Sequence, residues 1–494
     1  MAKEIRVAGI LCALYFVGAA SWAKQFPPVS TDEASYAVHG YNVWNGAGNR
    51  YSLYDDVFAP SVAYYRDATP ESSQIVFNAW VGAWLKILGK SYWHARLSSV
   101  IAGLLALGLF MRLGCRLGRA RTSVWILALV ALNPLFITAS CLVRPEMLLL
   151  VGELFSLVLL LELPDGFVWK HAVIGALCGL LMGVHHNAAL WLIGLWAYEG
   201  NVKKIAQMTA GFVAGAILLL PFFNFYKVYT IQRLFFNAFY RPPLLTFPWH
   251  PVHWGIDLLA SFWNGLTFYV DAQAPGWQMA MRLACVSAGV GLWSSRGENE
   301  TRRRFLRAFA AIAVAMACLL SKKEALYALM LFPCLYLPAV LGSARRTWMA
   351  VATVGTLLAF GFFVRVSTAY RQRGPSFDAF AAQVRAAIGG SPGHVMAPAT
   401  LWFAFDSAQF RDLGATTLSH WYTGGERELA SWLGGWPVDT LMVQAAWKRT
   451  FLGPEGHALS LETALGCPVT FLGTVDSGLA GGPMEMYRLH HPKR

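Results

Sequence analysis

The strongest candidates for catalytic residues in this sequence are two neighbouring carboxylates, Asp32 and Glu33. They follow the first apolar segment, residues 7–23, after a short stretch that contains Pro27 and Pro28. Ionisable groups close to a membrane are energetically costly, so they indicate a functional site. A carboxylate in such a place can act as a general base toward a substrate hydroxyl.

The same stretch also has the pattern of a helix start. Ser30 and Glu33 are three residues apart, as in a capping box, where the serine caps the helix and the glutamate reaches back to it. The two interpretations are compatible, because a capped helix is also a rigid support for Asp32.

The composition places the chain among helical membrane proteins. Of the 494 residues, 56% are hydrophobic and 14% are charged, whereas soluble domains carry about 25% charged residues. The net charge of +13 comes from lysines and arginines in short loops between apolar segments, which is a topology signal and not a sign of nucleic-acid binding. None of the eight cysteines forms a CxxC pair, so neither a disulfide framework nor a zinc site is indicated.

About eleven apolar segments have a length near that needed to cross a bilayer. They are residues 7–23, 95–113, 122–140, 146–162, 171–185, 188–199, 205–223, 277–294, 305–320, 325–342 and 347–365. Four basic loops lie on one side if the N-terminus is cytoplasmic. These loops contain Arg112 to Arg121, Lys203 and Lys204, Arg296 to Arg307, and Arg345 with Arg346. The odd number of spans then places the carboxylate pair and the C-terminal region outside the cytoplasm.

Two long outer loops separate the spans. In residues 24–94, apolar positions from Ile75 to Leu88 recur at helical spacing, which predicts an amphipathic helix in the membrane interface, with an ordinary packed helix as the alternative. A weaker stripe of the same kind covers residues 34–45. Residues 224–276 are rich in Trp, Tyr and Phe, which favour the membrane–water boundary, and they either cover a lipid substrate or act as a simple anchor.

The C-terminal region has a different pattern. After the membrane domain, residues 1–365, short apolar runs alternate with predicted helices, which favours a small extracytoplasmic α/β domain over residues 366–494. The helices are predicted near 376–388 and 426–433, and the runs at 394–397, 438–443 and 469–472. No glycine-rich phosphate loop is present.

Further polar residues are expected at the outer ends of spans. They are Arg144 with Glu146, His185 with His186, and Lys322 with Lys323. Carboxylates and cations gathered on one face of the membrane suit a group transfer from a lipid phosphate, in which Lys or Arg stabilises the departing phosphate.

Each of these groups also has a structural interpretation. Arg144-Pro145-Glu146 is typical of a helix start with proline in the first turn and an early acid. For Lys322 and Lys323, the alternative interpretation is that they only solvate a tight turn. For His185 and His186, it is that they are polar residues of the membrane interface. A histidine pair near a glutamate is compatible with a divalent metal, but no HExxH or carboxylate spacing supports one, so we expect no metal and no cofactor.

The order of these segments and motifs resembles that of a known family. A first span followed by Asp-Glu, an interfacial helix pair and a second span is similar to the GT-C glycosyltransferases. The likeness is greatest to the group of protein O-mannosyltransferases and lipid A aminoarabinose transferases. Arg144-Pro145-Glu146 resembles the family's Arg-x-Asp/Glu at the start of the fourth span. The run from Lys323 to Tyr327 resembles its Lys-x-x-x-Tyr turn before a late span.

The resemblance implies an inverting transferase that uses a monosaccharide linked to polyprenyl phosphate. Asp32 would be the catalytic base, with Glu33 supporting it, and Lys323, Lys322 and Arg144 would hold the donor phosphate. Further site candidates are Glu146, His185, His186 and Tyr327. One departure concerns the Lys-Pro-Pro-Leu stretch of the aminoarabinose transferases, which here reads Thr-Pro-Glu-Ser over residues 69–72, so that lysine is missing.

These observations predict an enzyme of the bacterial plasma membrane. It would pass a sugar to a lipid, glycan or protein acceptor at the outer face. The alternatives are an envelope oligosaccharide polymerase or ligase, and a transporter or flippase of lipid-linked sugars. A transporter is expected to show paired repeats and charges at the membrane midplane, whereas the charges of this chain are at the ends of spans.

Overall fold

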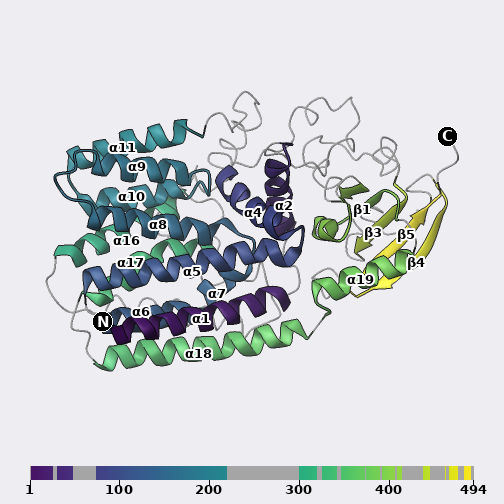
Figure 1. Cartoon of the computed structure of the whole chain (residues 1–494), viewed down its shortest axis with the longest axis horizontal. Coiled ribbons are helices and arrows are strands. Elements are labelled where there is room, and N and C mark those ends of the chain that lie inside the picture. The colour runs from purple at the N-terminus through teal and green to yellow at the C-terminus, as the bar shows by residue number, and fades with distance from the viewer. Residues whose placement is uncertain are drawn as a thin grey trace. The chain divides into compact units, whose positions relative to one another are not determined.

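The computed structural model describes most of the helical part of the chain and a small C-terminal sheet (Figure 1). The described residues are 2–25, 31–47, 74–118, 120–219, 300–319, 325–341, 346–372, 374–389, 392–406, 409–413, 438–444, 462, 467–476 and 483–490. The predicted span 277–294, the outer loop 224–276 and the helix near 426–433 lie outside these ranges.

The bounds of the elements are as follows. The α-helices are α1 (Ala2–Gln25), α2 (Thr31–Trp44), α4 (Ile75–Leu88), α5 (Tyr92–Leu117), α6 (Ala120–Ala131), α7 (Pro134–Cys141), α8 (Pro145–Glu162), α9 (Lys170–Leu181), α10 (Ala188–Glu199), α11 (Val202–Ile217), α16 (Glu300–Leu319), α17 (Phe332–Tyr336), α18 (Arg346–Arg371) and α19 (Phe377–Ile388). The 3₁₀ helices are η5 (Ala325–Leu331), η6 (Leu337–Val340) and η7 (Ala399–Ala404). The strands are β1 (Val395–Ala397), β2 (Phe410–Asp412), β3 (Thr440–Gln444), β4 (Val469–Val475) and β5 (Met484–Leu489).

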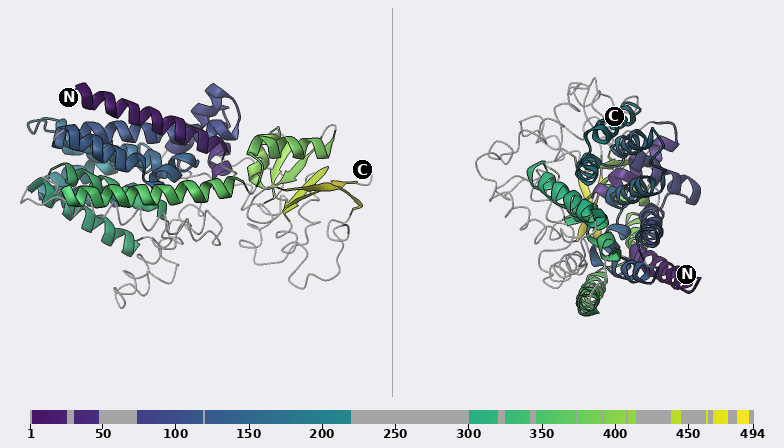
Figure 2. Two further views of the ribbon diagram at one scale, coloured as in Figure 1. Left: turned by 90° about the horizontal axis from the view of Figure 1, so that it is seen from below. Right: turned by 90° about the vertical axis from the view of Figure 1, so that its left-hand side faces the viewer.

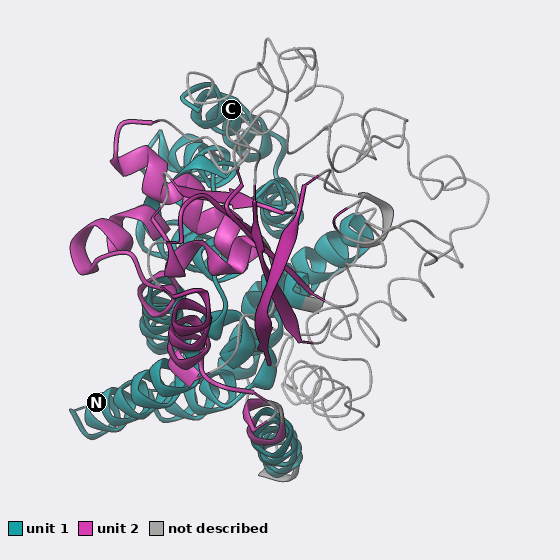
Figure 3. Ribbon diagram, turned by 90° about the vertical axis from the view of Figure 1, so that its right-hand side faces the viewer, with its two compact units in different colours: residues 1–23, 73–80, 96–367 teal, residues 24–72, 81–95, 368–494 magenta. Residues whose placement is uncertain are grey.

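The chain divides into two compact units (Figure 3). The first, the helical unit, comprises residues 1–23, 73–80 and 96–367, and the second comprises 24–72, 81–95 and 368–494. Helix α2, with the carboxylate pair, therefore belongs to the same unit as the C-terminal sheet. The predicted domain boundary between residues 365 and 366 stays a prediction.

The helical unit has the character of a multi-pass membrane protein. Among the described helices, α1, α5 and the part of α18 from Met349 to Ala369 are each long and apolar enough to cross a membrane. Helices α1 and α18 meet toward their C-terminal ends, where the Trp22 ring packs edge-on against Phe363 at a centroid distance of 4.6 Å. They diverge toward their N-terminal ends, as the left view of Figure 2 shows. Apolar side chains of α1 are exposed, among them Leu14 at 65%, as expected of a surface that faces lipid.

Two of the predicted spans have a different form from the one expected. The segment 122–140 is broken into α6 and α7, which are bent by 61° relative to one another. The break occurs because Pro134 cannot continue a helix, and Asn133 instead caps α7 by accepting the Leu135 N–H at 2.9 Å. The segment 325–342 is a 3₁₀–α–3₁₀ run, with prolines at the first turns of both α17 and η6.

Helices α9 and α11 pack through facing glycines. Gly175 and Gly179 of α9 and Gly211 and Gly215 of α11 each form a GxxxG pair. A Cβ atom added at Gly211 would lie 1.9 Å from the Ala172 carbonyl oxygen, and one at Gly175 would lie 2.0 Å from the Met208 carbonyl oxygen. Only glycine therefore allows the two backbones to approach this closely.

The C-terminal region forms a mixed sheet with the strand order β2-β1-β3-β5-β4. Strand β1 pairs in parallel with β2 and β3, whereas β5 pairs in the antiparallel direction with β3 and β4. Helix α19 precedes the sheet, and the Ser376 side chain caps it by accepting the Ala379 N–H. This arrangement confirms the predicted α/β character.

The facing glycines of α9 and α11, here called the glycine seam, predict that a larger residue at one of them lowers stability. Gly211→Ala places a methyl group against the Ala172 backbone and forces α9 and α11 apart. We expect it to lower the stability of the purified protein by about 1–3 kcal/mol, measured as a fall in melting temperature in detergent. Gly361→Ala in α18 is the matched control, because no atom lies within 4 Å of the added Cβ. An unchanged melting temperature in Gly211→Ala would contradict the seam.

Candidate active site

The first turn of α2 presents its two acids to different environments. Glu33 is fully buried, at 0% exposure, whereas Asp32 is partly exposed. Neighbouring residues on a helix point about 100° apart, so one acid faces inward while the other does not. Both acids also benefit from the partial positive charge of a helix N-terminus.

The Glu33 carboxylate has a specific partner in the second unit. The Tyr92 hydroxyl, at the start of α5, donates a hydrogen bond to Glu33 Oε2. Tyr92 is itself buried, at 3% exposure. A carboxylate withdrawn from water needs such donors, so Tyr92 stabilises the inward position of Glu33. The capping alternative depends on Ser30, which lies outside the described residues.

Helix α2 also packs closely against α4. A Cβ atom on Gly82 of α4 would lie 2.1 Å from the Gly40 carbonyl oxygen of α2. At the far end of α2, Lys86 Nζ donates to Asn45 Oδ1 at 3.3 Å. The two helices predicted in the outer loop 24–94 are therefore confirmed as helices, and they contact one another.

Arg144 and Glu146 form a buried ion pair in the helical unit. Arg144 Nη2 lies 2.8 Å from Glu146 Oε1, and both side chains are at most 5% exposed. Arg144 is the N-cap residue of α8 and Pro145 follows it in the first turn. The structural interpretation of Arg144-Pro145-Glu146 as a helix start is thus correct, and it does not exclude a contact of Arg144 with a ligand.

Three of the remaining predicted site residues lie together in the helical unit. The rings of His185 and His186 stack with centroids 4.1 Å apart, and the Tyr327 ring is 5.5 Å from that of His185. His185 is buried, and its Nδ1 accepts the Asn187 N–H at 3.1 Å. His185 Nδ1 is therefore an acceptor and carries no proton in this arrangement.

Lys322 and Lys323, the predicted phosphate contacts, lie outside the described residues. Within the described ranges, no three His, Cys, Asp or Glu side chains are grouped so that they could hold a metal ion.

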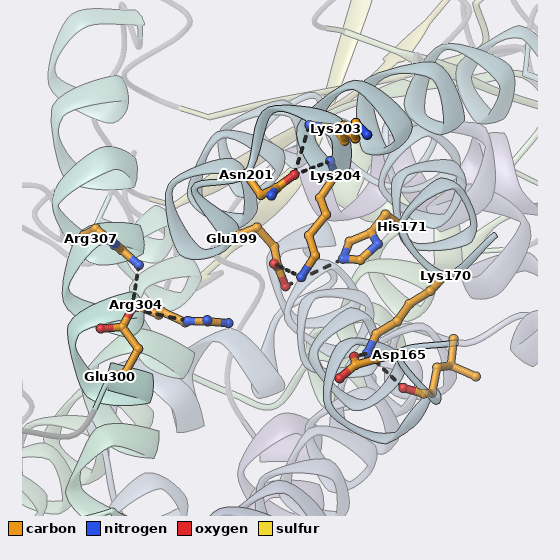
Figure 4. A network of polar contacts seen from close by, with 11 residues as sticks. Asp165, Lys170, His171, Glu199, Asn201, Lys203, Lys204, Glu300, Arg304 and Arg307 are labelled. Carbon is orange, nitrogen blue, oxygen red and sulfur yellow. Dashed lines mark hydrogen bonds and ion pairs between the residues drawn. The ribbon is translucent and has the colours of Figure 1, made fainter. Parts of the chain in front are cut away.

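A second polar cluster lies in the helical unit, where the predicted cytoplasmic loops meet (Figure 4). Lys204 Nζ is 2.7 Å from the Glu199 carboxylate, Lys170 Nζ is 2.9 Å from Asp165, and Arg307 is 3.2 Å from Glu300. A cavity of about 440 Å³ is lined by Arg116, Lys204 and Arg304, one from each of three predicted basic loops. The structure places them near the ends of α5, α11 and α16. These three loops therefore share one side of the helical unit.

Sequence reasoning missed two residues of the second unit, Tyr92 and Lys90. Lys90 Nζ donates to the Phe405 carbonyl oxygen at 2.6 Å and lies 4.0 Å from the centroid of the Trp402 ring. Burial lowers the pKa of Lys90 to about 7, although the Asp406 carboxylate acts in the opposite direction. The only signal in the sequence was a lysine in the short connection between two apolar helices.

No protein-family profile and no curated protein sequence matches this chain. Among solved structures, the crystal structure of ArnT from Cupriavidus metallidurans bound to undecaprenyl phosphate is similar, with a TM-score of 0.60 at 12% sequence identity over 97% of both chains. The apo state of that protein gives a TM-score of 0.49 at 14% identity over 97% of both chains. The first match confirms the GT-C fold that the resemblance implied, and at this identity it shows the fold alone.

Lys90 generates a pH-dependent stability prediction. The folded protein releases the Lys90 proton near pH 7, whereas the unfolded chain holds it to about 10.5. The stability cost of the buried charge is therefore full below pH 7 and falls as the pH rises from about 7 to 10.5, with a total on the order of a few kcal/mol. Replacing Lys90 by methionine should raise the melting temperature, relative to the wild type, more at pH 6.5 than at pH 9.5. An equal difference at both pH values would contradict this assignment.

Proposed function

We propose that this chain is a membrane glycosyltransferase. It transfers a monosaccharide from a polyprenyl-phosphate-linked donor to a lipid, glycan or protein acceptor at the outer face of the membrane, with inversion at the anomeric carbon. The observation that carries the proposal is the carboxylate pair of α2, with Glu33 buried and Asp32 partly exposed, on the fold of ArnT. Undecaprenyl phosphate, the ligand named for that ArnT structure, is itself a polyprenyl phosphate and supports this donor class.

The proposed reaction is a single displacement. Asp32 takes the proton of the acceptor hydroxyl, and the hydroxyl oxygen forms a bond to the anomeric carbon. The bond between that carbon and the phosphate oxygen breaks, and its electron pair leaves with the polyprenyl phosphate. Attack from the face opposite the leaving group inverts the configuration.

The leaving phosphate needs positive charge beside it. In this proposal Lys323 supplies most of that charge, with Lys322 and Arg144 as further contacts, on the basis of the Lys-x-x-x-Tyr run and the polar pattern in the sequence. Glu146 orients Arg144 through their buried ion pair. His185, His186 and Tyr327 form an aromatic wall that suits contact with a sugar ring.

The proposed location is the bacterial inner membrane, with the N-terminus in the cytoplasm, about eleven spans, and residues 366–494 on the periplasmic side. The shared cavity of the basic loops supports this orientation, because it places three positively charged loops on one side of the helical unit.

The test of this proposal is Asp32→Asn. Mass spectrometry of lipids and envelope glycans, from cells with and without the protein, first identifies the product. Asparagine keeps the size and much of the hydrogen bonding of aspartate but removes the base. We therefore expect turnover to fall by about 10²–10⁴-fold, with expression and undecaprenyl phosphate binding unchanged.

The matched control is Asp378→Asn, which alters an acid of the first turn of α19. A loss at Asp32 no larger than that control would mean that Asp32 serves only the helix terminus. Retention of more than about a tenth of wild-type transfer in Asp32→Asn would refute the general-base role.

The donor contact is tested by Lys323→Ala. Loss of one charge-assisted hydrogen bond to the phosphate should weaken donor use by about ten- to a hundredfold, while the protein still inserts into the membrane. The measurement is undecaprenyl phosphate binding together with the KM for the donor. Unchanged donor kinetics would move the role to Lys322 or Arg144.

A further inference from the structure

An aromatic cluster surrounds the tyrosine that binds Glu33. The Tyr92 ring stacks on Phe377 with a centroid distance of 4.9 Å and an interplanar angle of 27°. It also meets the Phe403 ring edge-on at 5.1 Å. Phe377 begins α19 and Phe403 lies in η7, so both partners come from the C-terminal region of the second unit. The position of the Tyr92 hydroxyl is therefore set by residues that lie far from it in the sequence.

The same region also contacts α2 directly. The Tyr41 ring of α2 meets the Trp402 ring of η7 with centroids 5.5 Å apart, and Trp402 in turn contacts Phe403 at 5.0 Å. Lys90, two residues before Tyr92, donates to the Phe405 carbonyl oxygen just after η7. Helix η7 thus contacts both α2 and the start of α5, where the partner of Glu33 is located.

We propose that the C-terminal α/β domain positions the catalytic base, and that Tyr92 is the positioning residue through which it acts. The contacts of Phe377 and Phe403 hold the Tyr92 ring, the Tyr92 hydroxyl holds Glu33 inside, and the buried Glu33 sets the rotation of α2 that leaves Asp32 accessible. This inference rests on the proposed function, because it assigns the role of the base to Asp32.

The physical reason is the geometry of adjacent residues on a helix. Asp32 and Glu33 point about 100° apart, so any rotation of α2 that brings Glu33 toward water turns Asp32 by the same angle. Removal of the Tyr92 hydroxyl takes one donor away from a buried carboxylate and favours such a rotation. Misplacement of a base by about 1 Å is enough to cost about 10²-fold in rate.

The direct test is Tyr92→Phe, which keeps the ring and its packing but removes the hydroxyl. We expect kcat to fall by about ten- to a hundredfold, while the KM for the lipid-linked donor and the binding of undecaprenyl phosphate stay within about twofold. The matched control is Tyr487→Phe on β5, because the Tyr487 hydroxyl makes the same kind of hydrogen bond to Glu485. This control should retain wild-type kcat.

Two further variants distinguish positioning from loss of folding. In the Glu33→Gln variant the amide oxygen still accepts the hydrogen bond from Tyr92, so this variant should lose less kcat than Tyr92→Phe. The double variant Glu33→Gln/Tyr92→Phe should have a kcat only slightly lower than that of Tyr92→Phe alone. Phe403→Leu removes the edge-on contact with the Tyr92 ring but leaves the Tyr92 hydroxyl in place. This variant should lower kcat with an unchanged KM.

Wild-type kcat in both Tyr92→Phe and Phe403→Leu would overturn the inference, even if Asp32→Asn is inactive. A fall in Tyr487→Phe equal to that in Tyr92→Phe would overturn it as well, because the effect would then follow from general destabilisation. An active Asp32→Asn variant would instead refute the proposed function itself. The two failures are therefore distinguishable.

Discussion

The hydrogen bond between the Tyr92 hydroxyl and the Glu33 carboxylate is the interaction on which the candidate site depends. It joins the first turn of α2 to the first residue of α5, which are 59 positions apart in the chain. A carboxylate that is withdrawn from water without enough donors costs about 1–3 kcal/mol or more. The bond lets α2 keep one acid inside and the next one near the surface. In the proposed reaction, the position of Asp32 therefore depends on a contact that Asp32 does not itself make.

The helical unit is held together by constraints of another kind. Helices in lipid gain little from the hydrophobic effect when they associate, so close backbone contact and buried polar pairs matter more. Close backbone contact is provided by the facing glycines of α9 and α11, Gly175 with Gly179 and Gly211 with Gly215. A buried polar pair is formed by Arg96 of α5, which is fully buried and donates to the Ala23 carbonyl oxygen near the end of α1 at 3.1 Å. Glu153 of α8 is an exception, because its buried carboxylate has no hydrogen-bond partner among the described residues.

The sequence predicted the features that depend on local pattern. Apolar length predicted α1, α5 and α18, helical spacing predicted α4, and alternation predicted β1, β3 and β4. Hydropathy alone joins residues 122–140 into one segment, whereas Pro134 divides it into two helices. The strands β2 and β5 were not predicted, because charged residues (Arg411 and Asp412 in β2, Glu485 and Arg488 in β5) interrupt their apolar runs. The Tyr92–Glu33 bond could not be predicted, since no local pattern encodes a contact over 59 positions.

The Arg144–Glu146 pair limits which cation can serve the donor phosphate. Glu146 lies 2.8 Å from the Arg144 guanidinium in a buried setting, and it neutralises most of the charge that Arg144 would offer. A phosphate that reached Arg144 would meet this second anion at short range, and like charges in a site of low dielectric repel strongly. A phosphate at Arg144 would therefore compete with Glu146 for the guanidinium. In the proposed reaction Arg144 is therefore a secondary contact of the phosphate, which agrees with the main role proposed for Lys323.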